Sequence, residues 1–139
     1  MRSIKIDGGY FLRLEKGEEI VGALTEFAAA NDIQAATISG IGALTEVKLG
    51  YFDRDQKRYL DKTFYEIYEL LSLNGNIGSF EGKPVIHAHC VIGTADYRVH
   101  GGHLFSGLVA VTGEIQIRVH GRILERRIDD EFKLKLLAF

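Results

Sequence analysis

Apolar residues recur along this chain with two spacings, one typical of a helix and one typical of strands. In one segment they fall at i, i+4, i+7 and i+8, which predicts an amphipathic helix with Ile20, Leu24, Phe27 and Ala28 on one face. Glu18 and Glu19 precede this segment and complement the positive end of the helix dipole, and the helix is expected to end near Asn31. We expect the apolar face of the helix to cover one side of a sheet.

The other apolar segments are short and rich in β-branched and aromatic residues, which predicts strands. In chain order the expected strands are Ile4–Leu14 with a break at Gly8-Gly9, Ala35–Ile38, Val47–Phe52, Tyr59–Phe64, Tyr65–Leu73, Val85–Ile92, Leu108–Val111 and Glu114–His120. The segment Tyr65–Leu73 is ambiguous because its two glutamates also allow a helix, and we favour a strand.

Polar and glycine-rich segments predict where the chain reverses direction. Arg54–Arg58 is expected to be the turn of a hairpin, and Asn74-Gly75-Asn76 is expected to form a second turn. The segment Ser39–Ala43 could expose amides to a phosphate, but it lacks a third glycine and a following Gly-Lys-Ser/Thr, so we expect a tight connection between strands. Near the end, Leu137 and Phe139 predict a docked terminus.

Four of the five histidines lie between Pro84 and Leu104. Residues two apart on a strand share a face, so His87 and His89 are expected to point the same way, opposite a wholly apolar side. His103 follows Gly101-Gly102, which could turn the backbone back toward that strand. Three imidazoles with one open position form the ligand set of catalytic zinc. The alternative is that His87 and His89 are ordinary strand residues facing a subunit contact.

The composition predicts one globular domain over residues 1–139, because 46% of the residues are hydrophobic and 26% are charged. No apolar signal segment opens the chain and no uncharged run is long enough to span a bilayer, so we expect a cytoplasmic protein. The single cysteine, Cys90, fits a reducing compartment, and its place on the apolar side predicts a core residue.

The charge distribution gives little indication of nucleic-acid binding, because the net charge is −2. Two small cationic clusters are present, one with Arg54, Lys57, Arg58 and Lys62 and the other with Arg122, Arg126 and Arg127. Three acidic residues, Asp129-Asp130-Glu131, follow the second cluster, which favours a salt-bridged surface over a phosphate track. Binding to DNA would need a local patch or several copies facing one side.

Several segments taken together carry a family resemblance: Ser39–Ala43, Tyr68–Asn76, His87–His89, Gly101–Leu104 and Thr112–Glu114. They resemble the plants-and-prokaryotes-conserved (PPC) domain, whose prokaryotic members are often labelled PD1-like predicted DNA-binding proteins. The resemblance implies an α+β domain with a mostly antiparallel β-sheet and one main helix packed on it, usually assembled as a homotrimer. It also implies that His87, His89 and His103 form a divalent-metal site, commonly zinc. Plant relatives grip A/T-rich DNA through an Arg-Gly-Arg-Pro motif that this chain lacks, so that affinity does not carry over.

Two hypotheses for the function follow. The first is a homotrimeric metal-binding module, with DNA binding indicated by the family label alone. The second is a zinc-dependent enzyme acting on a small molecule, for which Glu114 is the first candidate acid or base and Asp96 and Tyr97 are others. His100 and His120 are expected to lie outside the ligand set. An enzyme needs a concave pocket with the open metal position at its floor, whereas a binding module needs a basic or apolar docking surface.

Overall fold

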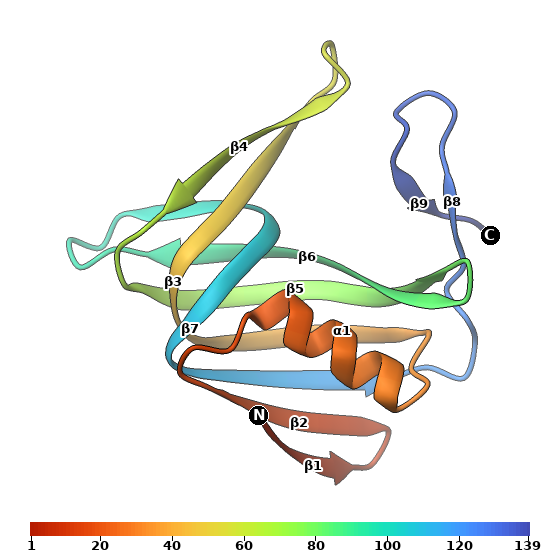
Figure 1. The fold of residues 1–139 in the computed structure, drawn as a ribbon, viewed down its shortest axis with the longest axis horizontal. Coiled ribbons are helices and arrows are strands. Elements are labelled where there is room, and N and C mark those ends of the chain that lie inside the picture. Colours follow the sequence, from red (N-terminus) through yellow and green to blue (C-terminus); the bar gives the residue numbers. More distant parts are fainter.

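The computed structural model describes residues 1–139 and contains nine strands and one helix (Figure 1). In chain order they are β1 (Arg2–Ile6), β2 (Gly9–Glu15), α1 (Ile20–Ala30), β3 (Ala36–Asp53), β4 (Arg58–Phe64), β5 (Tyr68–Phe80), β6 (Lys83–Gly93), β7 (Val99–Val119), β8 (Arg126–Ile128) and β9 (Lys135–Leu137). Every strand pairing between these elements is antiparallel, so the predicted α+β class with one main helix is confirmed.

Seven strands form one sheet in the order β1-β2-β7-β6-β5-β3-β4, and β7 also pairs with β3. Strand β5 pairs with both β6 and β3, and β7 also pairs with both β6 and β3. These four strands therefore form a closed ring of hydrogen-bonded neighbours. Strand β3 has 18 residues and β7 has 21, and register shifts between them allow the sheet to bend (Figure 1). The first part of β7 therefore lies beside β6, whereas its last part lies beside β2.

Helix α1 packs its apolar face on the sheet, as predicted (Figure 1). All four residues of the predicted stripe are buried, and they belong to a hydrophobic core of 23 residues. The Glu19 carboxylate caps the helix by accepting hydrogen bonds from the backbone amides of Val21 and Gly22, at 3.0 and 2.6 Å. It also accepts one from the amide of Gly107 on β7, at 3.1 Å. The cap therefore fixes the start of the helix against the sheet.

The prediction of turns at three glycine-containing segments is wrong. These segments lie inside strands: Ser39–Ala43 in β3, Asn74-Gly75-Asn76 in β5 and Gly101-Gly102 in β7. Glycine allows close approach between strands there; a Cβ on Gly42, for example, would lie 2.2 Å from the backbone carbonyl oxygen of Thr112 on β7. The chain passes from β6 to β7 through the polar segment 94–98 instead.

Most other local predictions hold, but Leu108–Val111 and Glu114–His120 lie in the single strand β7 rather than in two strands, and the C-terminus also differs. The break at Gly8-Gly9, the hairpin turn before Arg58 and the choice of strand for most of 65–73 are confirmed. The hairpin of β8 and β9 stands at the ends of β5 and β6, where Glu125 bridges to Ser79 (Figure 1). Phe139, however, is fully exposed, so its predicted docking is wrong. No helix in the structure has the length and apolar character that a bilayer crossing requires.

Candidate metal centre

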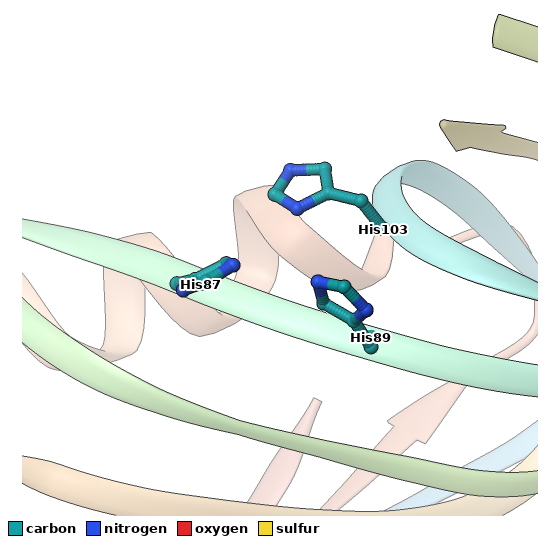
Figure 2. A group of neighbouring side chains, drawn as sticks. All are labelled: His87, His89 and His103. Atoms are coloured by element: carbon teal, nitrogen blue, oxygen red, sulfur yellow. The ribbon is translucent and has the colours of Figure 1, made fainter. Parts of the chain in front are cut away.

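The three histidines of the predicted site lie on the neighbouring strands β6 and β7 (Figure 2). His89 is directly opposite His103 in the antiparallel register, and His87 precedes His89 by two residues on β6. His87 and His89 share one face as predicted, while Ala88 and Cys90 are buried on the other. Strand pairing, rather than the predicted glycine turn, brings His103 to this face.

The three imidazole rings converge on one point (Figure 2). One ring nitrogen from each histidine lies within 4.8 Å of the others, and the ring centroids are 5.2 to 5.4 Å apart. Two nitrogens bound tetrahedrally to one zinc ion at about 2.1 Å each are about 3.4 Å apart, so the side chains must rotate to close on the ion. Nδ1 of His103 is buried without a hydrogen-bond partner, and a metal ion bound to this nitrogen would satisfy it. The donor set and its spacing therefore fit a divalent metal.

The electrostatic environment keeps two of the imidazoles neutral. Burial lowers the pKa of His103 to about 4, and the nearby His87 and His89 act in the same direction. Burial also lowers the pKa of His87, and the positive charge of Arg126 adds to this effect. A histidine binds metal in its neutral form, so both residues present the ligating form at neutral pH.

Aromatic side chains form one wall of the site. The ring of His103 lies 4.9 Å from that of Tyr59 on β4 and 4.8 Å from that of Phe105, between centroids. Gly50 pairs with His103, and a Cβ on Gly50 would lie 2.4 Å from the Phe105 ring, so glycine leaves the space that these rings occupy. Burial raises the pKa of Tyr59, and its hydroxyl remains protonated at neutral pH. Packing rather than hydrogen bonding thus orients the His103 ring.

Arg126 is a further residue of this region, and the sequence interpretation of it as a surface cation is wrong. Its side chain is only 4% exposed. Nη2 donates to Oδ1 of Asn76 at 2.6 Å, and Nη1 donates to the backbone carbonyl of Lys135 at 2.6 Å. Asn76 lies directly opposite His87 in the pairing of β5 with β6, so Arg126 is held beside the histidines. The sequence signal that could have indicated this contact is the segment Asn74-Gly75-Asn76. The side chain of Asn76 accepts the hydrogen bond from Arg126.

A cleft of about 300 Å³ opens between the histidines and the C-terminal hairpin. His87 and His103 line one side of it, and Tyr59 contributes from β4. Arg126 and residues 133–136 line the other side. The site therefore has the concave shape that a small ligand requires.

The remaining candidate residues lie outside this site. Glu114 is exposed on β7, faces hollows formed with Phe11 and neighbouring residues, and does not line the histidine cleft. His100 packs against the Phe64 ring at 4.7 Å between centroids, and His120 is exposed beyond the end of β7. Asp96 and Tyr97 belong to the turn between β6 and β7, where Tyr97 is 95% exposed.

Comparison with known families and structures agrees with this fold. The model of the Plants and Prokaryotes Conserved (PCC) domain matches residues 1–120. The chain belongs to this family. Arg126 and the C-terminal hairpin lie beyond the matched residues. Among curated proteins, none matches the chain significantly.

Three solved structures illustrate the similarity. A Bacteroides thetaiotaomicron protein, described as a "putative dna binding protein", is 33% identical with a TM-score of 0.96, covering 99% of this chain and 96% of that one. A PPC protein of Pyrococcus horikoshii is 33% identical with a TM-score of 0.88, covering 99% and 94%. A metal-containing protein of Archaeoglobus fulgidus is 37% identical with a TM-score of 0.86, covering 94% and 93%.

Proposed function

We propose that this chain is a homotrimeric metal-binding module that holds one divalent ion, zinc, through His87, His89 and His103. The observation that carries the proposal is the convergence of three imidazoles from β6 and β7 on one point. Nitrogen donors of this kind suit zinc, and three of them leave one position open. The metal-containing relative from Archaeoglobus fulgidus supports the proposal.

The surroundings of the histidines favour binding over hydrolysis. A zinc ion held by three histidines supplies a Lewis acid, but efficient hydrolysis also needs a group that moves protons. No aspartate or glutamate lines the cleft, and Glu114 faces other parts of the surface. Tyr59 lines the cleft, but its raised pKa makes it a poor base at neutral pH. The residues present therefore suit recognition of a ligand at the metal.

Assembly is supported by an exposed apolar patch on the sheet face opposite α1. This outer apolar patch consists of Phe11 on β2, Ile41 on β3, Leu71 on β5 and Val111 on β7, which are 46 to 67% exposed. The four residues line two adjoining hollows of the surface, so the patch is continuous. Such a patch is typical of a protein–protein interface, and a closed cyclic trimer would cover it in every subunit.

DNA binding has less support from the surface of this chain. The tip of the β3–β4 hairpin carries Arg54, Lys57 and Arg58, but Asp53 and Asp55 lie beside them in the sequence. Arg126 is buried, so only Arg122 and Arg127 of the second predicted cationic cluster remain on the surface. We therefore expect DNA to be a weak and salt-sensitive partner of the trimer.

Elemental analysis of protein grown with added zinc tests the metal proposal. We expect about one zinc per chain, and loss of most of it in His87→Ala, His89→Ala and His103→Ala. His120→Ala is the matched control, because this histidine is exposed outside the site. Circular dichroism should show that the ligand variants keep the fold, since a hydrophobic core of 23 buried residues does not need a metal to form. Metal-free wild-type protein, or equal loss of metal in the control, would overturn the proposal.

A further inference from the structure

We propose that the cleft between the histidines and the C-terminal hairpin binds a small oxyanion, a carboxylate or phosphate group, held by Arg126 and Lys133 beside the metal position. This inference deepens the proposed metal-binding function and rests on it for the location of the ligand. The hairpin that supplies both cations lies beyond the residues matched by the family model.

The charges around the cleft are of one sign. Arg126, Lys133 and Lys135 line it, and no carboxylate does. The Lys135 ammonium lies over the Phe80 ring at 4.1 Å, so it is engaged by that ring, and Arg126 and Lys133 are the cations that we assign to the ligand. A divalent ion on the histidines would add two further positive charges, so an anion is the ligand that this environment favours.

Arg126 gives the more specific indication, because it is a buried charge without a counterion. It takes part in no salt bridge, and its two hydrogen-bond acceptors, the Asn76 side chain and the Lys135 carbonyl, are both neutral. Its Nε is buried and has no hydrogen-bond partner. Buried charges in proteins are normally paired, and leaving one unpaired is costly. A bound oxyanion in the cleft would supply the missing negative charge.

The guanidinium is also held in place before any ligand arrives. Asn76 fixes one terminal nitrogen from β5, and the hairpin backbone fixes the other from β9. Gly78 leaves the necessary space, because a Cβ there would lie 2.9 Å from Nε of Arg126. A preorganised guanidinium loses little entropy on binding, which favours recognition of a planar or tetrahedral oxyanion.

Lys133 approaches from the connection between β8 and β9. Its backbone has a φ of 58°, a conformation uncommon for a residue with a side chain, and its amide donates to the carbonyl of Asp129 at 2.9 Å. Its ammonium is 3.9 Å from the fully exposed Asp130 carboxylate, a weak surface contact that an anion in the cleft could replace. Lys133 is therefore a second cation available to the ligand.

Isothermal titration calorimetry on the zinc-loaded full chain tests the proposal, with oxalate as the carboxylate probe and inorganic phosphate as the other. We expect at least one of them to bind, and the stronger one identifies the oxyanion class. Arg126→Gln should weaken binding by about tenfold or more, and Lys133→Gln by about threefold. Lys133 is exposed, so its variant remains informative if Arg126→Gln fails to fold. Lys16→Gln is the matched control, because Lys16 is exposed and does not line the cleft.

Metal content measured on the same samples separates this proposal from the one on which it rests. Both cation variants should keep their zinc, whereas His103→Ala should lose it. Zinc-loaded protein that binds neither probe, or variants that bind as well as wild type, would overturn the anion site alone. Anion binding that depends on Arg126 in a protein that holds no metal would overturn the metal proposal alone.

Discussion

Gly75 on β5 lies so close to His87 on β6 that a Cβ at position 75 would stand 2.2 Å from the carbonyl oxygen of His87. The same Cβ would lie 2.7 Å from Cα of Ala88, its partner in the register. Glycine at this position therefore sets the spacing between the two strands. The backbone that carries His87 and His89 depends on that spacing.

Substitution of this glycine should affect both stability and the site. We expect Gly75→Ala to lower the free energy of unfolding by about 1–3 kcal/mol, because the added methyl forces β5 away from β6. Zinc affinity should fall as well, because His87 and His89 move relative to His103. Urea denaturation and a competitive zinc chelator measure the two effects. Gly121→Ala is the control, since a Cβ there would meet nothing within 4 Å; equal effects in both variants would contradict this role.

The single cysteine should be chemically inert in the folded protein. Burial raises the pKa of Cys90 to about 11 from 9.0, so almost no thiolate forms at pH 8. We expect iodoacetamide to leave Cys90 unmodified in native protein and to modify it fully in denaturant. Because the folded pKa is the higher one, this group stabilises the fold fully below pH 9, and the contribution is lost as pH rises toward 11. Rapid native-state alkylation would show that the thiol is accessible.

The outer apolar patch should be required for assembly. A charge within the patch would have to be desolvated in the interface, so Val111→Glu should shift the protein from trimer to monomer at micromolar concentration. Light scattering after size exclusion reports the mass directly. Ile123→Glu is the control, because Ile123 is 61% exposed but lies outside the patch. A wild-type protein that is monomeric, or a Val111→Glu variant that remains trimeric, would count against this interface.

Binding to duplex DNA should be weak and electrostatic. We expect fluorescence anisotropy to detect binding at about 50 mM salt and to lose it at about 200 mM, because few cations contact phosphate. The combined change Arg54→Gln, Lys57→Gln and Arg58→Gln should remove most of the signal, whereas Lys16→Gln should not. Tight, sequence-selective binding at physiological salt would contradict this expectation.

Features that depend on neighbours along the chain could be predicted from the sequence alone. The stripe of α1 follows from helical spacing, and the shared face of His87 and His89 follows from the alternation of a strand. Burial of Cys90 follows from the same alternation, because its neighbours two residues away are also apolar. These periodicities are properties of the local backbone, so no tertiary information is needed to predict them.

Only the tertiary structure decided what faces each of these segments. His103 reaches the site because the register of β6 with β7 places it opposite His89. The sequence of one strand alone does not determine the register in which it pairs with another. Gly40 and Gly75 look like turn residues until the adjoining strand is present to occupy the space that a side chain would fill. Arg126 looks like a surface cation because its partner Asn76 is 50 residues away. Its burial depends on the C-terminal hairpin folding back on the sheet, a long-range contact that no local pattern encodes.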